Sequence, residues 1–81
     1  MNWYVYILRC RDNSLYTGIT NNIKRRMHIH AVGRGSKYVK ARLPFVLVYT
    51  AQVDGKSEAL KLEYKIKKIS KIEKEKLICE H

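Results

Sequence analysis

The stretch WYVYILRCRDNSLYTGIT, residues 3–20, decides the fold of this chain. Residues 2–10 are almost all apolar or aromatic and rich in β-formers, which is typical of a central strand. The next four residues, RDNS, supply turn chemistry, and residues 15–19 have the pattern of a second strand. The stretch therefore predicts a hairpin with Tyr6 and Tyr16 on either side of its turn. There the two tyrosines either pack in the core or belong to a functional site.

The register of the hairpin decides between these possibilities, because side chains alternate across a sheet. A three-residue loop, DNS, places Cys10 opposite Tyr16 and turns Tyr6 and Tyr16 to the same face. A four-residue loop, RDNS, pairs Cys10 with Leu15 and, without a bulge, sends the two tyrosines to opposite faces. We expect the shared face, with Tyr4, Arg26 and Glu63 on that side and Trp3, Val5 and Ile7 on the other.

The rest of the chain alternates helix and strand signals. Thr20 or Asn21 can cap a helix that runs to about residue 30, followed by a basic, glycine-rich loop and a short helical turn over residues 38–43. Residues 45–53 predict a third strand, Ser57 a cap for a helix through about residue 69, and Ser70 with Glu73 a capping box for a helix to about residue 78. The order β-β-α-β-α-α predicts one α/β domain over residues 1–81, a small three-stranded antiparallel sheet flanked by helices.

Charge is the strongest bulk signal. The 81 residues carry 17 Lys and Arg against 7 Asp and Glu, a net charge of +10. Between residues 21 and 44 there are seven basic residues and no acidic one. A field of one sign favours a polyanionic partner such as nucleic acid over a merely solvated surface.

The cysteines and the hydropathy indicate the compartment. Cys10 and Cys79 are far apart and lack the spacing of a zinc site or a disulfide framework. No apolar run is as long as a membrane span, and the first residues lack the basic start of a signal peptide. We therefore expect a cytoplasmic protein with no membrane association.

Helical periodicity places three polar residues on apolar stripes. With about 100° per residue, Arg26 and His30 lie beside the stripe of Ile23 and Met27, whereas Arg25 and His28 point to solvent. On the next long helix Glu63 lies within the stripe of Ala59 and Ile66. An inward arginine and an inward glutamate are expensive unless they are paired or bind ligands. They form either a structural ion pair, with His30 a satisfied core histidine, or a pocket for an anion and a cation.

The ordered set of Tyr6, Tyr16-Thr17-Gly18, Arg26, His30 and Glu63 resembles the GIY-YIG nuclease family, also called the URI endonuclease domain. The resemblance covers residues 3 to about 70 and is closest to the short, stand-alone bacterial UPF0213 subgroup, through the blocks YVYILRC, LYTGIT and EALKLE. Tyr4 and Val5 stand where the first tripeptide of the family has Gly and Ile. The asparagine that larger members carry near the end of the domain has no counterpart after Asn22.

The resemblance implies a metal-dependent nuclease, an endonuclease or exonuclease that hydrolyses DNA phosphodiester bonds in repair or processing. In that family Tyr6 or Tyr16 would be the general base, its pKa lowered by Arg26 and the metal, and His30 would accept the proton or contact the phosphate. Arg26 would stabilise phosphate charge, and Glu63 would hold one divalent cation, Mg²⁺ with Mn²⁺ as the alternative. We expect flanking phosphates to meet Gly18, Arg34, Lys37, Lys40 and Arg42.

Two other functions remain open from the sequence. The same fold can serve as a nucleic-acid-binding module with little catalysis, or as an interaction domain whose basic face is only solvated. DNA is the expected partner, with RNA as the alternative, and we expect a monomer that can dimerise on DNA.

Overall fold

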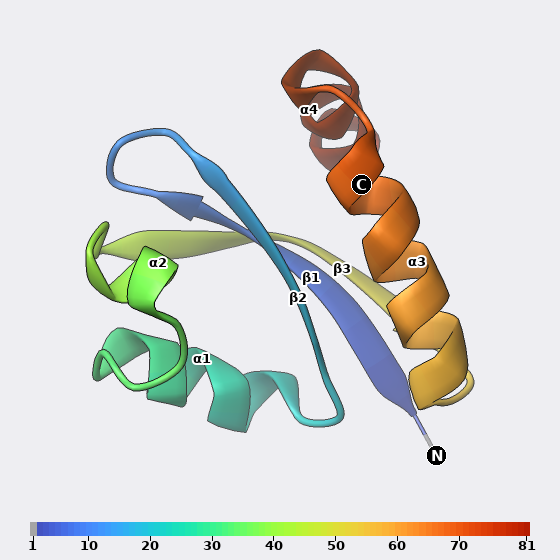
Figure 1. Cartoon of the computed structure of the whole chain (residues 1–81), viewed down its shortest axis with the longest axis horizontal. Coiled ribbons are helices and arrows are strands. Elements are labelled where there is room, and N and C mark those ends of the chain that lie inside the picture. Colours follow the sequence, from blue (N-terminus) through green and yellow to red (C-terminus); the bar gives the residue numbers. More distant parts are fainter. Residues whose placement is uncertain (1) are drawn as a thin grey trace.

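The computed structural model describes residues 2–81 and contains one three-stranded sheet with helices on both of its faces (Figure 1). In chain order the elements are β1 (Trp3–Cys10), β2 (Leu15–Thr20), α1 (Ile23–Ala31), α2 (Lys37–Lys40), β3 (Phe45–Val53), α3 (Lys56–Lys68) and α4 (Lys71–Glu80). The predicted order β-β-α-β-α-α is confirmed, with the expected helical turn present as the single-turn helix α2.

The sheet has the order β2-β1-β3, and both pairings are antiparallel. The hairpin loop has three residues, because the Cys10 N–H donates to the Ser14 carbonyl at 2.9 Å and Asn13 takes the left-handed conformation, φ 69°. Leu8 therefore faces Tyr16, and Tyr6 faces Gly18. The predicted pairing of Cys10 with Tyr16 is wrong by two residues. A shift of two keeps every side chain on its face, so the shared face of Tyr6 and Tyr16 is confirmed.

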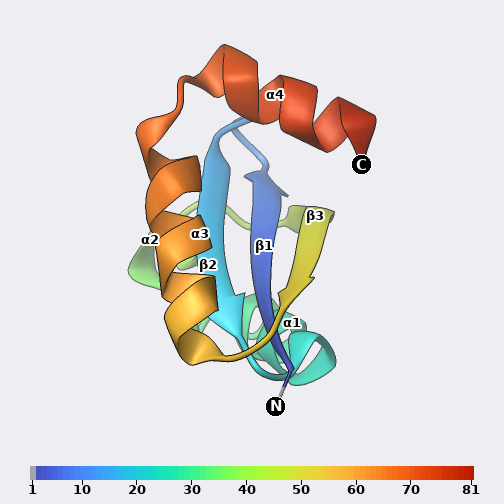
Figure 2. The same cartoon turned by 90° about the vertical axis from the view of Figure 1, so that its right-hand side faces the viewer.

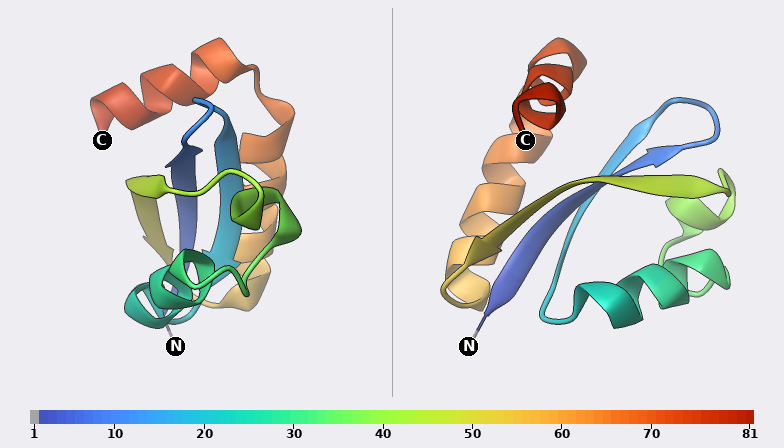
Figure 3. Two further views of the ribbon diagram at one scale, coloured as in Figure 1. Left: turned by 90° about the vertical axis from the view of Figure 1, so that its left-hand side faces the viewer. Right: turned by 180° about the vertical axis from the view of Figure 1, so that it is seen from behind.

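The two faces of the sheet form two separate apolar clusters. On one face Val5 and Ile7, with Trp3 beside them, pack against Ala59 and Ile66 of α3, as predicted for this side of β1. On the other face Tyr6, Leu8 and Cys10 pack with Val39 of α2 and with partly buried residues of α1 and β3. The opposed views of Figures 1 and 3 show α1 and α2 on one side of the sheet and α3 on the other.

The last helix, α4, crosses one end of the sheet near the β1–β2 turn (Figure 2). Two hydrogen bonds of 2.6 and 2.8 Å join the Arg9 guanidinium to both carboxylate oxygens of Glu75. The Lys71 ammonium also donates to the Asn13 carbonyl at 2.8 Å. A bidentate pair fixes orientation as well as distance, so these contacts hold α4 against the hairpin.

The helix caps agree only partly with those predicted. The capping box of Ser70 and Glu73 is confirmed, but α1 is capped by Asn22 instead of Thr20 or Asn21. The predicted cap at Ser57 is wrong, because α3 already begins at Lys56 after Gly55, which adopts φ 114° and provides no side-chain cap. Within residues 2–81 no helix combines the length and the apolar composition needed to cross a membrane.

Candidate active site

The centre of the site is a buried hydrogen bond between β1 and α1. The Tyr6 hydroxyl lies 2.8 Å from Nε2 of His30, and these residues are only 2% and 1% exposed. The prediction from helical periodicity that His30 faces the sheet is therefore confirmed, and so is the predicted exposure of Arg25 and His28. His30 is a proton acceptor or donor for Tyr6, and its other ring nitrogen, Nδ1, is buried without a hydrogen-bond partner.

Other aromatic rings surround this pair. The Tyr16 ring lies 6.4 Å from the Tyr6 ring and 5.6 Å from the His30 ring, measured between centroids. Tyr38 of α2 stacks on Tyr16, with 5.9 Å between centroids and 26° between planes, and Phe45 of β3 contacts the edge of His30. Sequence reasoning missed Tyr38 and Phe45 because nothing in their spacing connects them to the two tyrosines.

Two glycines make room for these side chains. A Cβ at Gly18 would lie 2.5 Å from the Tyr6 hydroxyl oxygen, and one at Gly35 would lie 2.5 Å from Nδ1 of His30. Any larger residue would push the tyrosine or the imidazole out of place. Gly18 is buried and has this packing role, and the phosphate contact expected from the sequence stays a prediction.

Arg26 stands beside the Tyr6–His30 pair on α1, on the predicted face. Its Nε is buried and has no hydrogen-bond partner. Among residues 2–81 it forms no salt bridge with Glu63, whose carboxylate instead lies 3.3 Å from the Lys67 ammonium. The structural ion pair between Arg26 and Glu63, considered from the sequence, is therefore not formed, and Arg26 keeps an unused donor and an uncompensated charge.

Glu63 reaches the site from a different direction than expected. It belongs to α3, which packs against β1 and β2 from the opposite side of the sheet, so the prediction of one common face holds for Arg26 but not for the helix of Glu63. The side chain of Glu63 is 19% exposed. Its negative charge nevertheless acts on Tyr6, whose pKa it helps to raise.

The carboxylate of Glu63 fits a hard divalent cation that takes few protein ligands. Mg²⁺ usually binds one or two carboxylates and completes its shell with water and substrate phosphates. Among residues 2–81 no group of three or more His, Cys, Asp or Glu side chains is placed to hold a metal ion. A cation on Glu63 would therefore depend on a phosphate for its further ligands.

The pKa values of Tyr6 and His30 are shifted in opposite directions, both away from neutral pH. Burial, the neighbouring Tyr16 and the charge of Glu63 raise the pKa of Tyr6 well above its usual range, and Arg26 only partly opposes them. Arg26 thus lowers this pKa, as predicted, but the three raising contributions outweigh it in the structure. Burial first, and then the charge of Arg26, lower the pKa of His30. At neutral pH the pair thus consists of a neutral phenol and a neutral imidazole.

The expected phosphate contacts divide into two groups. Arg34, Lys37 and Lys40 are exposed on α2 and the loop before it. Arg42 is engaged instead, because its Nε donates to Asp12 at 3.0 Å and its guanidinium carbon lies 3.8 Å from the centroid of the Tyr38 ring. Arg34, Lys37 and Lys40 can therefore bind a polyanion without breaking these contacts, whereas Arg42 cannot.

Comparisons with known proteins identify the family of this chain. Residues 2–76 match the model of the GIY-YIG catalytic domain. The UPF0213 protein OB0043 of Oceanobacillus iheyensis is 53% identical over 93% of this chain and 87% of its own length. The UPF0213 protein VC_A0739 of Vibrio cholerae is 51% identical over 95% of this chain and 77% of its own length.

Two solved structures share the fold. The solution NMR structure of the UPF0213 protein BH0048 from Bacillus halodurans has a TM-score of 0.63 and 48% identity, and covers 98% of this chain and 84% of its own. That of the protein EF2693 from E. faecalis has a TM-score of 0.66 and 34% identity, over 96% and 83% of the two chains. The chain therefore belongs to the GIY-YIG catalytic domain family, among its UPF0213 proteins.

Proposed function

We propose that this protein is a metal-dependent nuclease that hydrolyses phosphodiester bonds of DNA. The observation that carries the proposal is the hydrogen bond of 2.8 Å between Tyr6 and His30, next to an arginine that has no anionic partner among residues 2–81. A nuclease needs a group that takes a proton from water and a cation that stabilises charge at phosphorus. Tyr6 with His30, and Arg26, supply these two functions within one site.

Tyr6 is the better candidate for the general base. Its raised pKa prevents a standing phenolate at neutral pH, so it can accept a proton from water only if it passes its own proton on. The neutral His30 ring, whose pKa is lowered, is the acceptor at the required distance. Tyr16 is partly exposed and lies at the mouth of the same cluster, where it can orient the phosphate or the attacking water.

Arg26 and Glu63 complete the proposal. The Arg26 guanidinium can hold two oxygens of the scissile phosphate through its planar fork. A divalent cation held by Glu63, Mg²⁺ or Mn²⁺, would supply positive charge at the leaving oxygen. The exposed Arg34, Lys37 and Lys40 would contact neighbouring phosphates without reading the base sequence.

The test is cleavage of labelled DNA and RNA oligonucleotides with and without Mg²⁺. We expect DNA cleavage that requires the metal, and a rate at least about 100-fold lower for Glu63→Gln. Glu58→Gln is the matched control, since Glu58 is on the same helix, more than half exposed and paired only with Lys61. Equal cleavage by the wild type and Glu63→Gln would show a contaminating activity and remove the proposal.

A second function, nucleic-acid binding with little catalysis, is favoured by one observation. The metal site would rest on one carboxylate, within residues that carry a large positive charge. In that case the wild type would bind DNA with strongly salt-dependent affinity but leave it intact at every metal concentration.

A further inference from the structure

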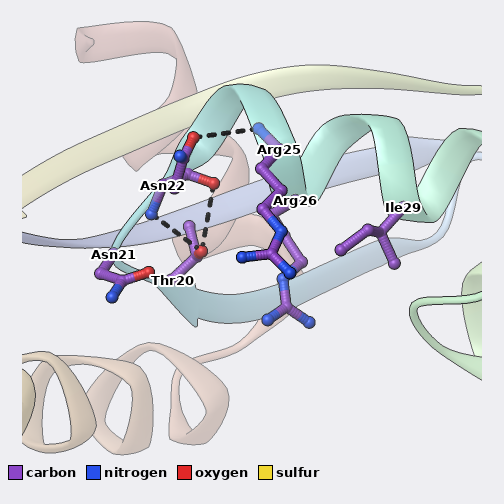
Figure 4. Close-up of a pocket in the computed structure, with 6 residues that line it drawn as sticks. All are labelled: Thr20, Asn21, Asn22, Arg25, Arg26 and Ile29. Atoms are coloured by element: carbon purple, nitrogen blue, oxygen red, sulfur yellow. Dashed lines mark hydrogen bonds between the residues drawn. The ribbon is translucent and has the colours of Figure 1, made fainter.

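Arg25 and Arg26 share one small cavity at the start of α1 (Figure 4). The cavity has a volume of about 140 Å³, and its walls come from the end of β2 and the first two turns of α1: Thr20, Asn21, Asn22, Arg25, Arg26 and Ile29. None of these six residues is acidic. The proposed nuclease function uses Arg26 and leaves Arg25 without a role.

Local hydrogen bonds hold the walls of this cavity in place. The Asn22 N–H donates to the Thr20 hydroxyl at 3.1 Å, and that hydroxyl donates to the Asn22 carbonyl at 3.2 Å. The Asn22 side chain then accepts the N–H of Arg25 at 3.0 Å. These bonds, drawn in Figure 4, close the turn and fix where α1 begins, so both arginines leave the helix in a set direction.

The electrostatics of the cavity favour an anion. The first turn of α1 contains Lys24 and Arg25 and no acidic residue. A helix N-terminus is already partly positive, and cations placed there are unfavourable. The buried Nε of Arg26 also lacks an acceptor. The positive charges of Arg25 and Arg26 and the positive N-terminus of α1 meet at this cavity, and a negatively charged ligand that enters it compensates them.

The size of the cavity limits the ligand. At about 140 Å³ the cavity has room for several water molecules. That volume has room for a phosphate group. The chemistry that fits is a single phosphate group of a nucleic-acid backbone, with the neighbouring phosphates and the bases outside the cavity.

We propose that Arg25 binds a second phosphate of the same DNA strand, adjacent to the scissile phosphate held by Arg26. This inference rests on the proposed nuclease function for the position of the scissile phosphate. It implies that the protein prefers a phosphodiester with a further charged phosphate on one side. A bond that lacks this neighbour, such as one at a strand end, is a poor substrate, so the cavity favours internal cleavage.

The test compares Arg25→Gln with Lys24→Gln in the full chain. Both variants remove one positive charge from the first turn of α1, but Lys24 is exposed and does not line the cavity. Binding to a short DNA is measured without metal, on a series in which single phosphates are replaced by neutral methylphosphonates. In the wild type we expect one methylphosphonate beside the cleavage position to weaken binding about 5- to 10-fold, as one charge-assisted contact would.

In Arg25→Gln that same methylphosphonate should have no further effect, whereas Lys24→Gln should keep the full 5- to 10-fold loss. If every methylphosphonate weakens Arg25→Gln as much as the wild type, Arg25 holds no particular phosphate and the inference is wrong. A loss that is absent from Lys24→Gln as well would mean that only the total charge matters, and would equally overturn it.

Inorganic pyrophosphate provides a readout that needs neither DNA nor catalysis. It should raise the melting temperature of the wild type and of Lys24→Gln, and by less than half as much for Arg25→Gln. Equal shifts in all three proteins would contradict the site. The two proposals fail separately. If the protein cleaves DNA but no methylphosphonate effect depends on Arg25, only the second phosphate site is wrong. If a methylphosphonate effect depends on Arg25 but the protein does not cleave DNA, only the nuclease proposal is wrong.

Discussion

The Tyr6 hydroxyl and Nε2 of His30 form a hydrogen bond of 2.8 Å inside the protein, with both residues at most 2% exposed. Either direction of this bond leaves one ring nitrogen of His30 without a partner, because Nδ1 is covered by Gly35. A buried polar atom left unpaired costs about 1–3 kcal/mol, so packing alone would favour an apolar pair here. The proton relay of the proposed nuclease reaction would give this buried pair a function.

The first prediction is that Tyr6 and His30 act as one unit in cleavage. Tyr6→Phe and His30→Gln should each lower kcat by roughly 100- to 10,000-fold, since each removes one step of the same proton transfer. The double variant should be about as slow as the slower single variant, because groups that act together are strongly non-additive. Single-turnover cleavage rates, measured with enzyme in excess over DNA, compare the single and double variants. If the fold-losses of the two single variants multiply in the double variant, the relay is contradicted.

The second prediction concerns the pH dependence of stability. The pKa of His30 is lower in the folded protein than the usual value of about 6.5 in the unfolded chain. Below that pH the unfolded state therefore binds more protons, and the free energy of unfolding falls as the pH drops. The slope can reach at most about 1.4 kcal/mol per pH unit for one proton.

Urea unfolding between pH 7.5 and 5 measures this slope. His30→Gln should lose most of the dependence in this range, whereas His28→Gln should keep it, because His28 is exposed on the same helix. An unchanged slope in His30→Gln would show that another group carries the acid sensitivity.

The third prediction is that Gly18 cannot be replaced without moving Tyr6. In Gly18→Ala the new methyl group would meet the Tyr6 hydroxyl oxygen at 2.5 Å and its ring carbon Cζ at 2.7 Å. Such overpacking destabilises a protein by about 1–3 kcal/mol. Removing the hydroxyl relieves part of the clash, so Gly18→Ala should cost less in a Tyr6→Phe background. Urea midpoints of the wild type, the two single variants and the double variant measure how far the two effects depend on each other. Strictly additive effects would show that the new methyl group does not clash with Tyr6.

The sequence predicted the elements of this fold better than the contacts between them. The alternation of side chains along strands and the periodicity of the helix predicted that Tyr6, Tyr16, Arg26 and His30 lie on one side of the sheet. Such periods depend only on local geometry. The same patterns could not supply the partners of these residues across the chain. Glu63 lies in the apolar stripe of α3 as predicted, but its approach from the other side of the sheet depends on how α3 packs against β1 and β2.

The loop after α1 shows the same limit. The phosphate contacts expected of its basic residues stay a prediction, while the structure gives two other residues of the loop a local role: Gly35 closes over the His30 ring and Ser36 caps α2. The role of Gly35 requires the loop to fold back on α1, which no local pattern indicates. The sequence thus predicted that the loop is basic and glycine-rich, but not which glycine is needed for packing.

The last prediction concerns Tyr38, which joins the site to the hairpin turn. One face of its ring lies on Tyr16, and the Arg42 guanidinium covers the ring at 3.8 Å while donating to Asp12 at 3.0 Å. Tyr16 and Arg42 thus both lie against the Tyr38 ring. We therefore expect Tyr38 to act as a positioning residue that restricts the Tyr16 side chain.

Tyr38→Ala should free Tyr16 and lower kcat by about 5- to 10-fold, as expected for the loss of one aromatic contact worth about 1 kcal/mol. Tyr38→Phe keeps the ring and should retain nearly full activity, with KM for DNA unchanged in both variants. The Tyr38→Ala effect should also disappear in a Tyr16→Ala background, because no side chain is then left to position. A rise in KM without a change in kcat would mean that Tyr38 binds DNA directly, and would overturn the positioning role.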